Sequence, residues 1–388
     1  MTLEHLGIAV ADPAAADLFR VLLGSAPYKA EVVEREGVRT LFFGDRGGAG
    51  RSPKLELLEA LGPESPVAKY LERRGPGLHH VAFEVDNLRE EIERLRAAGF
   101  EPLSDAPKRG ADGKQVVFFH PRSTGGVLVE LCEPAPEWER IAVPFEGGTL
   151  HALAAGPEGA PPLVVLHGAL GTTESETVCV ARRWAADFRV YALDFMGHGT
   201  SDAFEDRPLT GEAFTENVVA LLDAVGAPRA HVFGFSLGAA VALHFAVTHG
   251  ARVDRLATLG ANVQWSTDEA RAMTAAMVAA LDAPEGRWGR RLAEAHGMER
   301  WRGLAERMVR FTRELPERRL TDAMLAGVHC PTFVIHGDRD RYFDVRHAVH
   351  LRHVLPESRL WVIPGLDHPL HRADDRALAA EVAAFFRG

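Results

Sequence analysis

The sequence predicts an α/β protein with two domains: a small domain built twice from a βαβββ unit, and a larger one around a doubly wound sheet. Three observations support this prediction. An internal repeat runs through the first 134 residues, and the later part alternates short apolar runs with helical patterns. The turn Gly-Phe-Ser-Leu-Gly at residues 234–238 joins one such run to a helical pattern, which is typical of a serine raised at a sheet edge.

Composition limits the classes of function. The chain has 388 residues, 46% of them hydrophobic and 25% charged, which suffices for two domains with cores of their own. A formal net charge of −10 argues against nucleic acid or a membrane surface as the partner. Three scattered cysteines fit a reducing compartment, and neither a signal peptide nor a membrane-spanning run is recognisable. We therefore expect a cytoplasmic protein that acts on a small molecule.

The internal repeat of the first domain relates residues 3–10 (LEHLGIAV) to residues 78–85 (LHHVAFEV). Each run is strand-like and leads into a helical pattern. Each unit then closes on a further strand with a matching core, LELLE at 55–59 and VELCE at 129–133. The order strand, helix, further strands therefore occurs twice, which predicts two equivalent modules packed side by side.

Each repeat unit carries one histidine and one glutamate at corresponding places, His5 with Glu56 and His80 with Glu130. Packed side by side, the two modules would bring these four side chains together inside a cupped sheet. Two imidazoles and two carboxylates suit a divalent transition metal with positions left open for substrate oxygens. A satisfied core pair inside apolar strands is the alternative, but the repetition of all four residues favours a metal site.

These stretches resemble the vicinal-oxygen-chelate (glyoxalase-type) superfamily, and above all its methylmalonyl-CoA epimerases. The resemblance covers nearly all of residues 1–134 and rests on LEHLGIAV, KLELLEALGPESPVAKYL, GLHHVAFEVDNL and GKQVVFFHPRSTGGVLVEL. It implies metal ligands at His5, His80 and Glu130, with Glu56 at a fourth position that varies. It also implies a divalent ion (Co, Mn, Zn, Ni or Mg) that chelates an acyl thioester while carboxylates move the α-proton. The strand at residues 38–42, where one family member would place a base, has no carboxylate.

A short linker is predicted at residues 135–140, which divides the chain into domains at 1–134 and 141–388. Beyond the linker, apolar strands end in polar, glycine-rich loops, and ligand sites of such sheets lie at the carboxyl ends of the strands. Residues 262–325 interrupt this alternation with a stretch rich in Ala, Arg, Met and Trp at helical spacing. We expect this stretch to form a helical cap.

The candidate nucleophile is Ser236, at the apex of the strand-to-helix turn. Glycines on both sides allow the strained backbone that lifts its hydroxyl off the sheet and points the Leu237 N–H to the same place. A base and an orienting acid follow in loops after two late strands, His368 and Asp340. Asp338 is the alternative acid and His371 the alternative base.

The order Ser, Asp, His and the loops around it resemble the α/β-hydrolase superfamily throughout residues 141–388, closest to its enol-lactonases, carboxylesterases and carbon–carbon bond hydrolases. The resemblance implies an oxyanion hole formed by the backbone N–H groups of Ala169, in the loop His-Gly-Ala, and of Leu237. It gives this domain no cofactor. A serine nucleophile argues against the relatives that use aspartate.

Three functional hypotheses follow. In the first, a serine hydrolase of esters, thioesters or lactones is coupled to a metal-binding domain that binds or isomerises an acyl thioester of the CoA type. In the second, the hydrolase acts alone, and the first domain only binds substrate or dimerises the chain. This second hypothesis allows for a homodimer. In the third, the chain is a binding protein with decayed sites, which the intact motifs of both halves disfavour.

Overall fold

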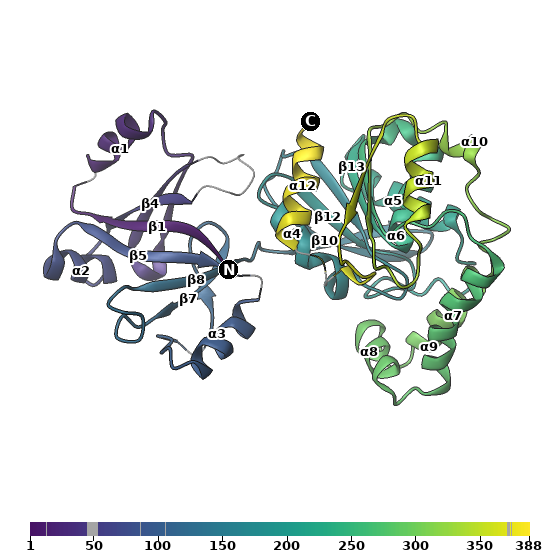
Figure 1. The fold of residues 1–388 in the computed structure, drawn as a ribbon, viewed down its shortest axis with the longest axis horizontal. Coiled ribbons are helices and arrows are strands. Elements are labelled where there is room, and N and C mark those ends of the chain that lie inside the picture. The colour runs from purple at the N-terminus through teal and green to yellow at the C-terminus, as the bar shows by residue number, and fades with distance from the viewer. Residues whose placement is uncertain (13, 45–52, 86, 105, 371–372, 374) are drawn as a thin grey trace. The chain divides into compact units, whose positions relative to one another are not determined.

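The computed structural model describes residues 1–12, 14–44, 53–85, 87–104, 106–370, 373 and 375–388. It divides into two compact units, residues 1–136 and 137–388 (Figure 1). Of the described helices, none is both long enough and apolar enough to cross a membrane.

The N-terminal unit forms a sheet in which the two repeat halves are arranged symmetrically. Strands β1 and β5, one from each half, pair antiparallel at its centre, and each pairs on its other side in parallel with the last strand of its own half. The described strands follow the order β2-β3-β4-β1-β5-β8-β7-β6. The predicted pair of βαβββ modules is therefore confirmed. The elements are β1 (Thr2–Val10), α1 (Ala15–Leu23), β2 (Lys29–Val33), η1 (Glu34–Glu36), β3 (Val38–Phe43), β4 (Lys54–Ala60), α2 (Pro66–Arg74), β5 (Gly77–Glu84), α3 (Leu88–Ala97), β6 (Lys108–Arg109), β7 (Lys114–Phe119) and β8 (Val129–Pro134).

Local signals fix the ends of the helices in this unit. The Ser65 side chain accepts a hydrogen bond from the Val67 N–H at the start of α2, and Asn87 does the same for Glu90 at the start of α3. Helix α1 ends at Gly24, whose φ of 65° is left-handed. These caps satisfy N–H groups that the helix cannot pair itself, so the helices begin where the sequence places Ser and Asn.

The C-terminal unit is built on a sheet whose central strands are parallel. The described strands follow the order β16-β15-β14-β13-β11-β12-β10-β9, with β9 and β10 antiparallel at one edge. The elements are β9 (Glu139–Phe145), β10 (Gly148–Ala155), β11 (Pro162–Leu166), η2 (Thr173–Thr177), α4 (Val178–Trp184), β12 (Arg189–Asp194), α5 (Gly211–Ala224), β13 (Ala230–Phe235), α6 (Leu237–Thr248), η3 (Gly250–Arg252), β14 (Val253–Leu259), α7 (Thr267–Asp282), α8 (Arg287–His296), α9 (Trp301–Glu314), α10 (Asp322–Leu325), β15 (Thr332–Gly337), α11 (Arg346–Val354), β16 (Ser358–Ile363) and α12 (Asp375–Arg387).

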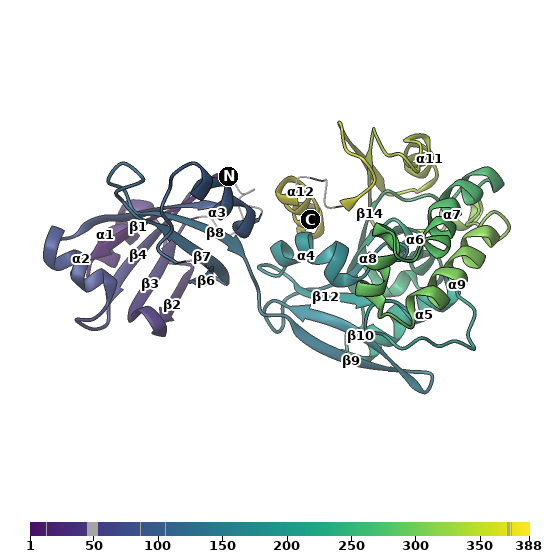
Figure 2. The same ribbon diagram turned by 90° about the horizontal axis from the view of Figure 1, so that it is seen from below.

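Helices cover both faces of this sheet because successive strand residues point to opposite sides. In β11, Val164 and Leu166 join the core shared with α5, α6 and α11, whereas Leu163 and Val165 join the core under α4 and α12. Figure 1 shows α4 and α12 together on one side of the sheet and α5, α6 and α11 on the other. Helices α7, α8 and α9, inserted between β14 and β15, pack against one another as a cap (Figure 2).

The turn between β13 and α6 is tightly packed. Ser236 has the left-handed φ of 53°, and a Cβ added at Gly234 would lie 2.3 Å from the carbonyl oxygen of Gly238. A Cβ at Gly238 would lie 2.4 Å from the carbonyl oxygen of Leu166 on the neighbouring strand. The two glycines therefore allow the strand, the serine and the helix to approach one another closely.

We expect Gly238→Ala to lower the free energy of unfolding of the C-terminal unit by about 2–4 kcal/mol, because backbone atoms must shift to accept the methyl group. Gly250→Ala is the matched control, since nothing lies within 4 Å of its added Cβ. Thermal unfolding of both variants measures the difference. Equal transition temperatures for the two variants would show that the turn is not tightly packed.

Candidate catalytic and metal sites

Loops at the carboxyl ends of β13, β15 and β16 bring three predicted side chains together. The Ser236 hydroxyl lies 2.9 Å from His368 Nε2, and His368 Nδ1 lies 2.7 Å from Asp340 Oδ2. The other Asp340 oxygen accepts backbone hydrogen bonds from Tyr342 (2.9 Å) and Phe343 (3.0 Å). Burial by itself would raise the pKa of Asp340, but the His368 ring and these N–H groups hold it below its usual value. This geometry lets His368 accept the serine proton and lets a charged Asp340 stabilise the resulting imidazolium.

The alternative acid predicted from the sequence is Asp338, and the alternative base is His371. Asp338 follows the same strand, but its Oδ1 accepts the Gly365 N–H at 2.5 Å, and no described contact joins it to His368. His371 lies outside the described residues. Of the two acids, the structure brings Asp340 to the imidazole.

The predicted oxyanion donors Ala169 and Leu237 line one cavity together with Ser236. The loop that carries Ala169 is held in place by His167, which is fully buried. His167 Nδ1 donates to the Gly168 carbonyl oxygen at 2.8 Å, and Nε2 accepts the Phe195 N–H at 3.2 Å. His167 therefore supports the loop from behind and does not line the cavities around the serine.

Two cavities open on either side of Ser236 in the C-terminal unit, of about 90 and 160 Å³. The first is lined mostly by apolar side chains such as Trp265, Met308 and Phe311. The second contains His368 and the Ala169 loop, and cap helices α7 and α8 line part of it. The two linings share Ala169, Ser236 and Met273 and otherwise differ.

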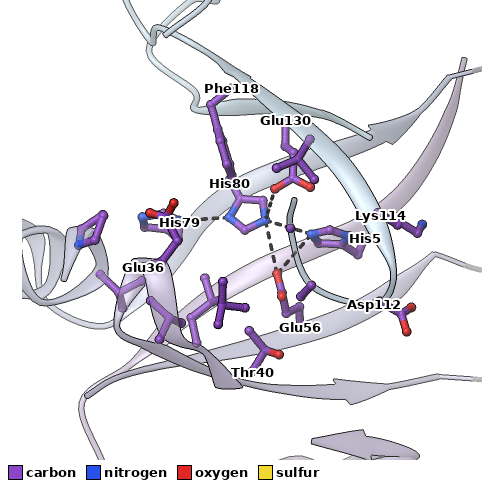
Figure 3. Close-up of a pocket in the computed structure, with 18 of the residues that line it drawn as sticks. His5, Glu36, Thr40, Glu56, His79, His80, Asp112, Lys114, Phe118 and Glu130 are labelled. Atoms are coloured by element: carbon purple, nitrogen blue, oxygen red, sulfur yellow. Dashed lines mark hydrogen bonds and ion pairs between the residues drawn. The ribbon is translucent and has the colours of Figure 1, made fainter. Parts of the chain in front are cut away.

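The four residues singled out in the repeat lie together in the N-terminal unit. Strands β1, β4, β5 and β8 carry one each, and all four are buried. His5 Nε2 lies 2.9 Å from His80 Nε2 and 3.2 Å from Glu56 Oε2, and His80 Nε2 lies 3.4 Å from Glu130 Oε2. Figure 3 shows these side chains turned toward one another from different strands. Donor atoms of His5, Glu56 and His80 all lie within 4.8 Å of one another.

The electrostatics of this cluster fit a bound cation. Burial alone would lower the pKa of His5, but hydrogen bonds to Glu4 and Glu56 raise it to about 10. Burial opposes ionisation of Glu56, yet both imidazoles hold its pKa at about 2, whereas burial raises the pKa of Glu130. The protein thus gathers buried carboxylates around two ring nitrogens, and positive charge on the rings or on an ion between them can balance these carboxylates. Two nitrogen and two oxygen donors suit a divalent transition metal.

Neighbouring groups orient the two imidazoles toward the centre of the cluster. His5 Nδ1 is hydrogen-bonded to Glu4, and Lys54 Nζ lies 2.9 Å from the other oxygen of that carboxylate. His80 Nδ1 lies 3.0 Å from Nδ1 of His79. Both rings therefore leave Nε2 for the shared site, the arrangement that carboxylates typically impose on metal-binding histidines.

Gly7 on β1 makes room for the His80 ring, because a Cβ added there would lie 2.2 Å from His80 Cε1. We expect Gly7→Ala to weaken binding of a divalent ion by about 10–100-fold, since the ring must leave its place. Isothermal titration with Co²⁺ or Zn²⁺ measures the affinity. Gly62→Ala, with nothing within 4 Å of its added Cβ, should bind like the wild type. Equal affinities of the two variants would argue against His80 as a ligand.

Comparison with known proteins agrees with both folds. Residues 4–118 match the glyoxalase/bleomycin resistance protein/dioxygenase superfamily, and residues 161–296 match the α/β hydrolase fold. The mitochondrial methylmalonyl-CoA epimerase of Homo sapiens is 39% identical over 131 residues, which cover 33% of this chain and 72% of that protein. An ethylmalonyl-CoA/methylmalonyl-CoA epimerase of Cereibacter sphaeroides is 39% identical over 132 residues, 33% of this chain and 95% of that protein.

By its N-terminal unit the chain therefore belongs to the glyoxalase superfamily, and its C-terminal unit has the α/β-hydrolase fold. Carboxylesterase YbfK of Bacillus subtilis is 32% identical to the hydrolase unit over 119 residues, which cover 31% of this chain but only 40% of that protein. The crystal structure of 2-hydroxy-6-oxo-6-phenylhexa-2,4-dienoate hydrolase from Rhodococcus superposes with a TM-score of 0.56. The two sequences are 22% identical, and the superposition covers 66% of this chain and 100% of the Rhodococcus chain. This is a likeness in fold alone.

One residue of the hydrolase unit was missed by the sequence reasoning. Glu176, in η2, lines the second cavity beside Ser236, and its Oε2 accepts the Gly168 N–H at 2.7 Å. Burial raises the pKa of Glu176 to about 7, although the Gly168 N–H and the charges of His368 and Arg291 act against this. No motif marks this glutamate, because it lies seven residues beyond Ala169, outside the sequence pattern of that loop.

In the glyoxalase unit, β3 presents Thr40 to the cavity beside the cluster, and this strand carries no carboxylate. Figure 3 shows Thr40 below Glu56, and Glu36 at the edge of the same cavity. Glu36 lies in η1, just before β3, and is paired with Lys108 Nζ at 2.5 Å. The carboxylates beside the histidines are therefore Glu4, which is bonded to His5 Nδ1, and the ligand candidates Glu56 and Glu130.

Proposed function

We propose that the C-terminal unit is a serine hydrolase of carboxylic esters, thioesters or lactones that uses Ser236, His368 and Asp340. The observation that carries this proposal is the continuous hydrogen-bonded chain from the Ser236 hydroxyl through both ring nitrogens of His368 to Asp340. The strained φ of Ser236 adds support, because such strain is typical of a nucleophile at the end of a strand. The carboxylesterase relatives support the same class of reaction.

Each residue has a role in the proposed reaction. His368 Nε2 takes the hydroxyl proton as Ser236 Oγ attacks the carbonyl carbon, and the backbone N–H groups of Ala169 and Leu237 stabilise the oxyanion. His368 then gives the proton to the departing alcohol or thiol, which leaves an acyl-serine. Water, deprotonated by the same imidazole, attacks the acyl-serine and releases the acid. Asp340 keeps Nδ1 protonated throughout.

We propose that the N-terminal unit binds a divalent metal through His5, Glu56, His80 and Glu130 and takes up an acyl thioester beside it. When bound, such an ion polarises a carbonyl oxygen and stabilises negative charge on it. The chain's own part is to hold the ligands: Glu4 fixes the His5 ring, and the four ligand candidates are buried at one end of a cavity that can take up the thioester. The named acyl-CoA epimerases among the relatives support an acyl thioester as the ligand.

A panel of p-nitrophenyl esters, lactones and acyl-CoA thioesters, including methylmalonyl-CoA, tests both proposals. The wild type, Ser236→Ala and His80→Ala are compared with and without a chelator, and exchange of the α-proton of methylmalonyl-CoA in D₂O is followed by NMR. We expect Ser236→Ala to abolish ester hydrolysis but not proton exchange. We expect His80→Ala or the chelator to abolish proton exchange but not ester hydrolysis. Hydrolysis without proton exchange would reduce the first unit to a binding or dimerisation module.

A further inference from the structure

The second cavity beside Ser236 contains a carboxyl group that the triad does not use. Glu176 lines this cavity together with Ser236 and His368, and its Oε2 accepts the Gly168 N–H at 2.7 Å. The other oxygen, Oε1, has no hydrogen-bond partner within the part of the chain that the structure describes, nor is it sealed off inside the protein. It is therefore available to a molecule bound in the cavity.

The surroundings of Glu176 make an unpaired oxygen costly. Most of the cavity wall near it is apolar, including Leu170, Met277, Leu292 and Leu370. A carboxyl oxygen in such surroundings loses its hydration and is stable only with a hydrogen-bond donor beside it. Arg291 and Tyr342 also line this cavity, but no described residue donates a hydrogen bond to Oε1, so a bound ligand can supply that donor in place of water.

The loop in front of Glu176 is shaped around this side chain. A Cβ added at Gly171 would lie 2.2 Å from Oε2, and one added at Gly168 would lie 3.0 Å from the same oxygen. Both glycines belong to the loop that carries Ala169, so the oxyanion loop and the carboxyl group are packed together. Glu176 is thus fixed at a set place relative to the reacting carbonyl, which a contact with the substrate requires.

The position of His368 indicates which part of the substrate lies next to Glu176. His368 returns its proton to the leaving group, so the leaving group must lie on the side of the serine that holds the imidazole. His368 lines the cavity that contains Glu176 and does not line the apolar cavity on the other side. The acyl chain therefore enters the apolar cavity, and the alcohol or thiol enters the cavity of Glu176.

We propose that Glu176 contacts the leaving group and selects esters and thioesters whose alcohol or thiol carries an amide N–H or hydroxyl group close to the scissile bond. The inference rests on the proposed role of Ser236. The donor hydrogen-bonds to Oε1, while Oε2 stays on Gly168. A plain alkyl leaving group would desolvate Oε1 without replacing its partner and is therefore disfavoured.

Two butyryl thioesters test this directly. The S-(2-acetamidoethyl) and S-(4-oxopentyl) thioesters differ only in an NH group that becomes CH₂. At about pH 8, where Glu176 with its pKa of about 7 is ionised, we expect wild-type kcat/KM to favour the amide about tenfold, or about 1.4 kcal/mol. Equal kcat/KM values for the two thioesters would overturn the inference.

The variant Glu176→Gln separates contact from packing. Its amide oxygen keeps the hydrogen bond from Gly168 and its NH₂ group faces the cavity, so the preference for the amide thioester should disappear while both are still hydrolysed. An unchanged preference would mean that Glu176 only supports the loop. Glu174→Gln, on the same turn but exposed and paired with Arg140 at 2.6 Å, is the matched control and should keep the wild-type ratio.

Should the Glu176 variant fail to fold, the wild-type ratio can be followed with pH instead. The preference should fall as the pH decreases through about 7 and the Glu176 carboxylate takes up a proton. His368 and Arg291, which face this carboxyl, affect both thioesters alike and cancel in the ratio. A ratio independent of pH contradicts the inference. Hydrolysis that survives Ser236→Ala would instead contradict the proposed function itself.

Discussion

Replacing Ser236 with alanine should lower kcat/KM for p-nitrophenyl butyrate by about 10⁵-fold or more. The hydroxyl is the only part of the machinery that this change removes, but without it no acyl-enzyme forms and the His368–Asp340 pair has no proton to accept. The oxyanion donors remain, so a small activity over water should persist. The measurement is steady-state hydrolysis at equal protein concentrations.

Ser358→Ala is the matched control for this experiment. Its hydroxyl donates to the Arg352 and Leu355 carbonyl oxygens at 3.1 and 3.0 Å, away from the cavities, so its activity should equal that of the wild type. Thermal unfolding should show that Ser236→Ala is folded. Activity of the Ser236→Ala variant within tenfold of the wild type would rule out this serine as the nucleophile.

Replacing His80 with alanine should weaken divalent-metal binding by about 10²-fold or more and abolish any metal-dependent proton exchange. His80 Nε2 faces His5, Glu56 and Glu130 at once, so its loss opens the centre of the cluster. Equilibrium dialysis followed by elemental analysis measures the bound metal. Ester hydrolysis should be unaffected, because the described residues that line the two cavities beside Ser236 all belong to the C-terminal unit.

The control for His80 is His120→Ala in the same unit. His120 Nδ1 accepts the Arg122 N–H at 3.1 Å and does not line the cavity of the cluster, so metal binding should be retained. If His80→Ala binds metal as tightly as His120→Ala, the cluster is not the metal site.

The fold could be predicted because its determinants are local. The similarity of residues 3–10 to residues 78–85 is visible in the amino-acid sequence, and it predicts a symmetric pair of modules. The turn around Ser236 is equally explicit, since Gly234 and Gly238 are needed where backbones approach to within contact distance. Both signals act over a few residues, where sequence patterns are most informative.

The other features of the two sites depend on contacts that the spacing of residues in the sequence does not predict. Asp338 and Asp340 both follow β15, and only the path of the loop decides that Asp340 meets His368 while Asp338 binds the Gly365 N–H. Glu4 precedes His5 in a strand, where alternation would send it to the opposite face, yet its carboxylate is bonded to His5 Nδ1. No sequence motif predicts that η2 places Glu176 in the cavity beside Ser236.

Labelling with a fluorophosphonate followed by mass spectrometry tests the central claim most directly. We expect one covalent adduct, on the peptide that contains Ser236, with labelling unaffected by a chelator and absent from Ser236→Ala. Labelling requires the activated hydroxyl and a working oxyanion hole, so it reports on the assembled site and not on any particular substrate. No adduct on the folded wild type, or an adduct on another residue, would contradict a serine hydrolase built on Ser236.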